Sequence, residues 1–300
     1  MGSDAVGPTG LTGPTGLTGP TGLTGLTGRA AVLGRPVSHS LSPVLHNAAY
    51  LALGRPWHYE AIDCGEQDLG DLLASAGDEW VGFSVTMPLK RVALALADVV
   101  EPRAVAVGAA NTLLPLRDRA APGWRATNTD VDGILRALAE VGAQPRTATI
   151  LGAGGTAQAA VAAIGELGLS SCTVLVRDPS RTADLKATAL RVGVELAIET
   201  FTDAHPALGS DLLLSTLPAH AADLLAIRTW HRDQVILDVV YDPWPTALAN
   251  SAQADGATVV SGALMLLHQA AAQVELMTGA SAPLQEMRDA LRGAAPRAGV

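Results

Sequence analysis

Thr147-Ala148-Thr149-Ile150-Leu151-Gly152-Ala153-Gly154-Gly155-Thr156-Ala157 is a short apolar run that leads directly into a glycine-rich turn. Residues 158–167 then favour a helix, so the segment predicts a strand, a turn and a helix in succession. Gly152 permits a tight turn, Gly154 lets a pyrophosphate approach the backbone, and small Ala157 allows close packing of helix on strand. Free N–H groups at the helix start bind phosphate. We therefore expect a bound dinucleotide, although a glycine-rich turn without a ligand is the alternative. The predicted contacts are Gly152, Ala153, Gly154, Gly155, Thr156 and Ala157.

Short apolar runs alternate with helical stretches on both sides of this turn. From residue 130 onward, six predicted strands at 147–151, 172–176, 194–198, 211–215, 235–239 and 258–260 indicate a doubly wound parallel sheet. Upstream, predicted strands at 30–33, 57–62, 81–85 and 109–114 are each separated from the next by a helix, as βαβ units require. Two helices at 263–277 and 283–291 follow the last strand. The fold class is therefore α/β.

This pattern divides the chain into two domains that are linked twice. Residues 29–129 plus 263–300 form an N-terminal α/β substrate-binding catalytic domain, because we expect the final helices to return to it. Residues 130–262 form a Rossmann-like dinucleotide domain. Before them, glycine recurs at every third position from Gly7 to Gly28, a collagen-like period. The stretch is short for a triple helix, so we expect residues 1–28 to be a disordered tail outside the fold.

Composition excludes several classes of protein. The formal net charge of −9 repels polyanions, and no basic patch offers a nucleic-acid surface. No apolar run is long enough to span a membrane, and no signal pattern opens the chain. Cys64 and Cys172 lie far apart, which favours buried thiols in a reducing compartment. The histidines lack metal-ligand spacing, so no metal is expected. A cytoplasmic enzyme fits these observations.

The residues after the second strand of the dinucleotide domain indicate which cofactor is bound. Arg177 and Arg181 stand four apart there, and two guanidinium groups can clamp a 2′-phosphate. Asp178 precedes Pro179 and is expected to cap a helix rather than to bind a ribose hydroxyl. We therefore predict NADP rather than NAD. A solvated surface pair is the alternative for the two arginines.

Polar side chains cluster near strand ends in the first domain. The segments are Ser38-His39-Ser40-Leu41-Ser42-Pro43, Ser84-Val85-Thr86-Met87-Pro88-Leu89-Lys90, Ala109-Ala110-Asn111-Thr112 and Thr127-Asn128-Thr129-Asp130. The hydroxyls of the first segment suit a carboxylate or other hydroxyls, and Ser42-Pro43 predicts a helix N-cap followed by proline. A hydride enzyme that reduces a carbonyl needs a proton donor at the oxygen, and Lys90 is the candidate.

With these motifs in the same order, the chain resembles the shikimate dehydrogenase family from about residue 29 to the final helices. Gly133, Met265-Leu266 and Gln269 extend the match. The resemblance implies NADPH-dependent reduction of 3-dehydroshikimate to shikimate, a step toward chorismate and the aromatic amino acids. It also implies that Ser40 and Ser42 hold the substrate carboxylate and that Gly262 and Met265 lie near the nicotinamide. The residues implied around the ring hydroxyls are Thr86, Lys90, Asn111, Asp130, Tyr241 and Gln269.

Physical chemistry agrees with a catalytic role for Lys90 and Asp130. Hydride addition builds negative charge on oxygen, and a nearby ammonium group stabilises and protonates it. Asp130 would orient Lys90. The alternative for Lys90 is an exposed helical lysine, and for Asp130 a first-turn acid favoured by the helix dipole. Both alternatives carry more weight without the resemblance.

Two departures from the family pattern concern fine specificity. Ser84 stands where asparagine is common, and Val176 where asparagine often precedes the arginine. Two alternative functions stay open, a quinate/shikimate dehydrogenase using NAD(P) and a non-catalytic NADP-binding regulator on the same fold. The expected partner is a small-molecule substrate, for a monomer or a homodimer.

Overall fold

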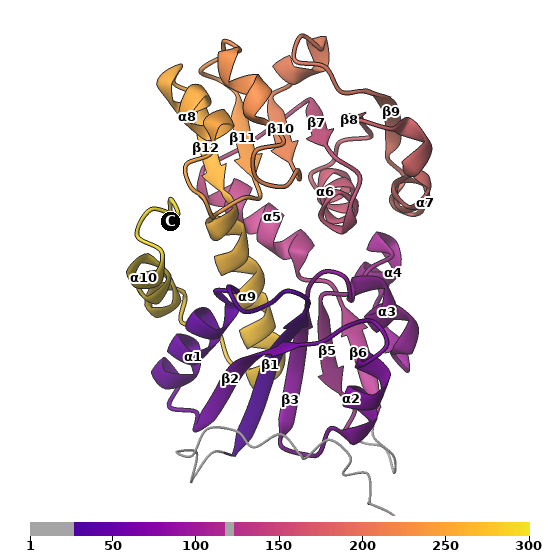
Figure 1. The fold of residues 1–300 in the computed structure, drawn as a ribbon, viewed down its shortest axis with the longest axis vertical. Helices are drawn as coiled ribbons and strands as arrows, with labels where there is room; N and C mark the ends of the chain where they lie inside the picture. Colours follow the sequence, from indigo (N-terminus) through magenta and orange to yellow (C-terminus); the bar gives the residue numbers. More distant parts are fainter. Residues whose placement is uncertain (1–26, 118–122) are drawn as a thin grey trace, which may run out of the picture.

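The computed structural model describes residues 27–117 and 123–300, which form two six-stranded sheets with helices packed around them (Figure 1). The tail expected at residues 1–28 lies outside the described residues except for its end. Gly28 there is the first residue of strand β1 (Gly28–Gly34).

The second sheet is the doubly wound parallel sheet that the sequence predicts. Its strands pair in the order β12-β11-β10-β7-β8-β9, and every pair is parallel. The strand order reverses between β7 and β10, and at such a point the following loops diverge and leave a crevice. The strands are β7 (Ala148–Leu151), β8 (Ser171–Val176), β9 (Glu195–Thr200), β10 (Leu212–Ser215), β11 (Val235–Asp238) and β12 (Thr258–Ser261).

Helices cover both faces of this sheet because its strands are apolar on both sides. One face carries α5 (Asp130–Glu140), α6 (Gly155–Glu166) and α7 (Ala183–Val192). The other carries α8 (Ala247–Ala254) and short 3₁₀ helices η2 (Pro206–Gly209) and η3 (Asp223–Ile227). A further 3₁₀ helix, η1 (Pro179–Arg181), follows β8.

The first sheet differs from the prediction of parallel strands. Its order is β2-β1-β3-β5-β6-β4, and β5 runs antiparallel to both β3 and β6. The strand predicted at 109–114 begins only at Thr112, and β4 and β6 were not predicted. A short connection joins β5 to β6, and such a connection permits antiparallel pairing, whereas parallel pairing needs a long crossover. The remaining strands are β2 (Trp57–Asp63), β3 (Trp80–Val85), β4 (Val99–Val100), β5 (Thr112–Pro115) and β6 (Trp124–Thr127).

This reversal brings the polar segments of the first half together. Strands β1, β3 and β6 end at one edge of the sheet, while antiparallel β5 begins there. Asn111 therefore precedes its strand yet lies beside Thr86 and Asn128, which follow theirs.

Helices also cover both faces of the first sheet. α2 (Leu69–Ser75) and α3 (Lys90–Leu96) pack on one face, while α4 (Pro102–Val107) faces the second half of the molecule. α1 (Ser42–Ala52) packs on the other face. The predicted N-cap at Ser42 is wrong, because Leu41 occupies that position and Ser42 is already helical. The Ser40 hydroxyl instead accepts the Ser42 N–H at 3.3 Å, so the capping oxygen comes from two residues upstream.

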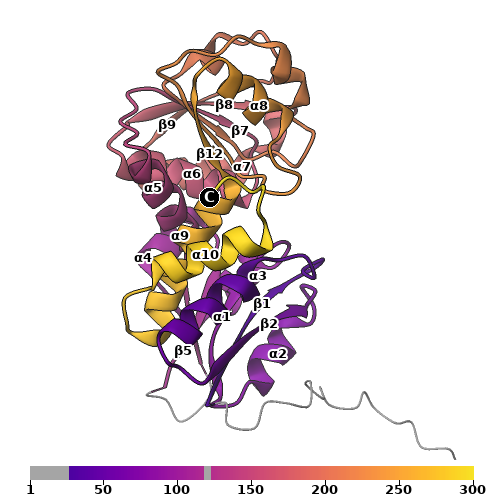
Figure 2. The same cartoon turned by 90° about the vertical axis from the view of Figure 1, so that its left-hand side faces the viewer.

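The chain returns to the first sheet as predicted. α9 (Gly262–Thr278) starts at the second sheet and runs down to the first, and α10 (Leu284–Ala294) lies against α1 (Figure 2). α9 also crosses α5 closely, since a Cβ on Gly133 would come within 2.8 Å of the Met265 carbonyl oxygen. Together α5 and α9 form the double link between the two sheets.

Candidate active site

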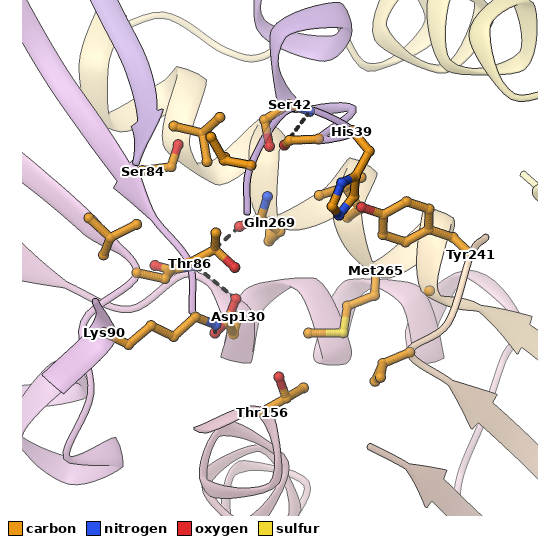
Figure 3. A pocket seen from close by; sticks show the side chains of 18 of the residues that line it. His39, Ser42, Ser84, Thr86, Lys90, Asp130, Thr156, Tyr241, Met265 and Gln269 are labelled. Carbon is orange, nitrogen blue, oxygen red and sulfur yellow. Dashed lines mark hydrogen bonds and ion pairs between the residues drawn. The ribbon is translucent and has the colours of Figure 1, made fainter. Parts of the chain in front are cut away.

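A cavity of about 300 Å³ lies between the two sheets, at the edge where the polar segments meet (Figure 3). Its walls come from both halves of the molecule, with α9 between them. The residues with a predicted site role that line it are Ser40, Ser42, Thr86, Lys90, Asn111, Asp130, Thr156, Tyr241, Gly262, Met265 and Gln269.

Lys90 and Asp130 form an ion pair on one side of the cavity. Lys90 is the first residue of α3 and Asp130 the first of α5, and Lys90 Nζ lies 2.5 Å from Asp130 Oδ2. The Lys90 side chain is 19% exposed and that of Asp130 is 8% exposed. The ammonium is therefore held toward the cavity by a charge that solvent screens little.

Asn111 anchors the opposite oxygen of Asp130. Its Nδ2 donates to Asp130 Oδ1 at 2.8 Å and to Gln269 Oε1 at 3.1 Å. Its Oδ1 accepts the backbone N–H of Thr129 at 2.8 Å, which fixes the orientation of the amide. Asn128 supports the same turn by accepting the Asp130 N–H at 3.0 Å. The carboxylate is thus positioned by neutral donors as well as by Lys90.

The loop after β1 and the loop after β3 complete this wall. Ser40 and Ser42 lie where the chain enters α1, and Thr86 follows β3. Thr86 N–H donates to the Leu33 carbonyl at 2.9 Å, which joins the two loops. Ser42 and Ser84 therefore lie on the side of the cavity away from Lys90, while Thr86 lies close to Lys90 and Asp130 (Figure 3).

The loop after β11 contributes Tyr241 to the cavity, and α9 contributes Gly262 and Met265. A Cβ on Gly262 would lie 2.0 Å from the Val239 carbonyl oxygen, so only glycine lets this loop approach α9. Asp238, buried at the end of β11, accepts from Thr246 Oγ1 at 2.8 Å and braces the same loop. Burial, with the nearby charge of Asp242, raises the pKa of Tyr241, so its hydroxyl keeps its proton.

A second cavity, of about 820 Å³, opens at the switch point between β7 and β10 and meets the first. The two cavities share walls at Thr86, Lys90 and Thr156. Ala153 and Gly154, before α6, and Gly155, its first residue, line this cavity on one side. Residues 216–219, after β10, line it opposite. A bound molecule in the larger cavity can therefore reach one in the smaller.

The glycine turn fits a dinucleotide. Within residues 27–117 and 123–300, no side chain caps the N-terminus of α6 and a Cβ on Gly154 would meet nothing within 4 Å, so the backbone there is open to the cavity. Gly152 has φ +103°, where side chains are strained, and Ala157, in the first turn of α6, is fully buried. These last two residues shape the turn and do not line the cavity.

Arg177 and Arg181 lie at the carboxyl end of β8, and both side chains are exposed. Neither lines the two cavities in this structure. Asp178 caps η1 by accepting the Ser180 N–H at 3.0 Å, which confirms its predicted capping role.

Sequence reasoning missed two polar residues of the smaller cavity. His39 lines both cavities beside Tyr241, and Ser84 lines the smaller one. Both stand inside motifs that were recognised, so their place next to Ser40 and Thr86 was an available signal.

Other sequence expectations concern groups away from the cavities. Cys64 and Cys172 are both buried free thiols, and burial raises the pKa of Cys172 to about 12. Among residues 27–117 and 123–300, no cluster of three or more potential metal ligands occurs. In the same part of the chain, no helix is long and apolar enough to span a bilayer.

Comparison with known proteins gives a consistent result. Residues 32–113 match the shikimate dehydrogenase substrate binding domain, and residues 262–292 match the shikimate 5′-dehydrogenase C-terminal domain. The NADP(+) shikimate dehydrogenase of Moorella thermoacetica is 37% identical over 86% of this chain and 90% of its own length.

The chain is also similar to solved structures of shikimate dehydrogenases. The shikimate dehydrogenase of Mycobacterium tuberculosis is 45% identical, with a TM-score of 0.79 over 89% of this chain and 99% of that one. The Thermus thermophilus enzyme, solved with NADP(H) and shikimate, is 32% identical, with a TM-score of 0.76 over 89% of this chain and 99% of that one.

Proposed function

Because the chain belongs to the shikimate dehydrogenase family, we propose that its two joined cavities carry out reversible NADPH-dependent reduction of 3-dehydroshikimate to shikimate. The observation that carries this proposal is the Lys90–Asp130 pair, which stands where the two cavities meet. The reaction belongs to chorismate and aromatic amino acid biosynthesis.

NADPH, when bound, supplies the hydride that reduces the substrate carbonyl carbon. The carbonyl oxygen then gains negative charge, and the Lys90 ammonium stabilises that charge and donates the proton. Asp130 holds Lys90 in place, while Asn111 holds Asp130. In the reverse direction the substrate hydroxyl returns its proton to Lys90. Positioned proton transfer of this kind accelerates a reaction about 10²–10⁴-fold.

The other residues divide between the two cavities. In this proposal Ser40 and Ser42 hold the substrate carboxylate, since Ser42 lies on the side of the cavity away from Lys90 and the Ser40 hydroxyl bonds to the Ser42 N–H. Thr86, Tyr241 and Gln269 contact the ring hydroxyls. Residues 29–129 and 263–300 then act as the substrate domain and residues 130–262 as the NADP domain.

For the cofactor, residues 153–156 contact the pyrophosphate and Gly262 and Met265 lie by the nicotinamide. The uncapped start of α6 supports phosphate binding. Arg177 and Arg181 contact the 2′-phosphate, because both are exposed guanidinium groups at the end of the second strand of the sheet.

One assay tests substrate and cofactor together. The absorbance of the reduced cofactor is followed with shikimate or quinate, each combined with NADP or NAD. We expect shikimate with NADP to give the highest kcat/KM. Higher efficiency with quinate and NAD would favour the quinate dehydrogenase alternative, while no turnover with any combination would favour the regulator.

We also propose a cytoplasmic enzyme that is a monomer or a homodimer. The two buried free thiols support a reducing compartment. Sedimentation equilibrium measures the oligomeric state directly.

A further inference from the structure

A buried chain of hydrogen bonds lies behind Ser84, on the wall of the smaller cavity. Gln273 and Tyr59 are 0% and 1% exposed, and neither lines the cavity. Ser84 is 5% exposed and does line it. Ser84 bonds to both of the buried residues, to Gln273 Oε1 at 3.1 Å and to the Tyr59 hydroxyl.

One backbone N–H group determines which atom donates in each hydrogen bond of this series. The Thr129 N–H donates to Asn111 Oδ1, so that oxygen accepts. Thr112 Oγ1, at 2.8 Å from the same oxygen, must then donate to it. Gln273 Nε2 in turn donates to Thr112 Oγ1 at 2.9 Å.

Two observations fix the amide of Gln273 in the same orientation. Its Nε2 also donates to the backbone carbonyl of Asn111 at 3.3 Å, which can only accept. Its Oε1 therefore faces Ser84 and can only accept. The single hydroxyl hydrogen of Ser84 is thus donated to Gln273 Oε1.

The Tyr59 hydroxyl must then donate to Ser84 Oγ, because Ser84 has no second hydrogen to give. Burial raises the pKa of Tyr59 far above its usual value, so this proton stays in place at all working pH values. The Tyr59 ring is held by the His46 ring, stacked at 3.9 Å between centroids. One lone pair of Ser84 Oγ remains, and it is available to a molecule in the cavity.

We propose that Tyr59 and Gln273 are positioning residues that hold Ser84 as a hydrogen-bond acceptor for a substrate hydroxyl. This inference rests on the proposed function, which supplies a substrate with ring hydroxyls. Ser84 then selects a hydroxyl at one ring position and rejects a substrate that has a carbonyl or hydrogen there, since neither donates a hydrogen bond.

A double-mutant cycle on Ser84 and Tyr59 tests the proposal with shikimate and NADP. Ser84→Ala and Tyr59→Phe are each expected to raise KM for shikimate about tenfold, the usual effect of losing one hydrogen bond. The kcat and the KM for NADP should stay within about twofold. In the Ser84→Ala background, Tyr59→Phe should raise KM no further, because Tyr59 acts only through Ser84.

Tyr50→Phe is the matched control. Tyr50 is also fully buried, but among the described residues its hydroxyl bonds only to Met277 Sδ, at 3.4 Å, and it does not line the cavity. Its KM should match that of the wild type. If Tyr59→Phe does not fold, Gln273→Met replaces it in the same cycle.

The outcomes separate this inference from the proposed function. An unchanged KM in Tyr59→Phe, or an equal KM increase with and without Ser84, overturns the positioning role. A wild-type enzyme that does not oxidise shikimate overturns the function instead. As a second readout, shikimate analogues lacking the C4 or the C5 hydroxyl are compared. The wild type should discriminate against one of them about tenfold, and Ser84→Ala should not.

Discussion

At the scale of single residues, the site depends on charged groups and hydrogen-bond donors whose orientation is held by their neighbours. Lys90 is one of only two lysines in the chain, and it forms an ion pair with Asp130. Asn111 donates a hydrogen bond to the other carboxylate oxygen of Asp130. A lysine ammonium alone is a flexible point charge. The carboxylate and its amide partner remove that freedom before substrate arrives.

Replacing Lys90 tests its proposed role as proton donor. Lys90→Ala should lower kcat by about 10²–10⁴ with a modest change in KM for shikimate, because proton transfer is lost while most binding contacts remain. Steady-state kinetics measures both constants. Lys186→Ala, an exposed lysine on α7, is the control and should keep wild-type turnover. Near-normal turnover in Lys90→Ala would remove Lys90 from the mechanism.

His46 predicts how stability depends on pH. Complete burial, only partly offset by its hydrogen bond to the Ser42 carbonyl, lowers the pKa of His46 to about 4. Below its usual pKa of about 6.5, the unfolded chain binds a proton that the folded protein does not, so the free energy of unfolding falls as pH falls. Between pH 7.5 and pH 5 this group contributes about 2 kcal/mol of that loss.

The measurement is urea unfolding of wild type and His46→Phe at both pH values. The variant keeps a ring against Tyr59 and removes the titration. Its unfolding free energy should fall by about 2 kcal/mol less than that of the wild type. Equal losses in the two proteins would show that His46 does not carry this pH dependence.

At the scale of elements, the site forms because loops from both sheets approach α9 and α5 closely. Gly262 at the start of α9 allows the loop after β11 to lie against it, and that loop carries Tyr241. Gly133 on α5 allows the crossing that places Asp130 near Gln269. Small residues at these contacts therefore determine the width of the cavity.

Gly262→Ala is expected to destabilise the protein by about 1–3 kcal/mol, because its Cβ would overlap the Val239 carbonyl oxygen and force the loop away. The same shift should raise KM for shikimate. Gly293→Ala is the matched control in α10, where a Cβ would meet no atom of the described residues within 4 Å. This control should stabilise the protein by about 0.5–1 kcal/mol, since alanine favours helix. Urea unfolding measures the stability of both variants. Equal stabilities would contradict the predicted overlap between a Cβ at position 262 and the Val239 carbonyl oxygen.

At the scale of the whole molecule, the two sheets share one apolar core. The largest cluster of buried side chains runs from Leu45 on α1 through Ile134 on α5 and Leu267 on α9 to Val260 on β12. Polar contacts add to it, such as the ion pair of Arg103 on α4 with Glu166 on α6 at 2.8 Å. Neither half buries its apolar surface fully without the other.

This shared core predicts one cooperative unfolding transition. Calorimetry should give equal calorimetric and van't Hoff enthalpies, and shikimate and NADP should each raise the same melting temperature. Leu267→Ala should lower the stability of the whole molecule by about 2–5 kcal/mol, because that side chain is fully buried in the shared cluster. Two separate transitions, only one of which responds to NADP, would contradict this prediction.

Several features could be predicted because their causes are local in sequence. The turn at Gly152 needs a conformation that glycine adopts, and the apolar strand and the helix on either side follow from neighbouring residues. The doubly wound sheet and the return of the last helices follow from the same spacing. Asp178 caps η1 through a bond two residues away.

Tertiary structure alone decided the features that depend on pairing between distant segments. The antiparallel direction of β5, which brings Asn111 to Asp130, is set by hydrogen bonds to β3 and β6 and by no local pattern. The acceptor role of Ser84 likewise depends on Gln273, at the far end of the chain. The sequence by itself therefore determined the helices, the strands and the cofactor turn, because these depend on steric effects between neighbouring residues. Long-range hydrogen bonds, which form only in the folded chain, decided which side chains meet in the site and in which direction each one donates.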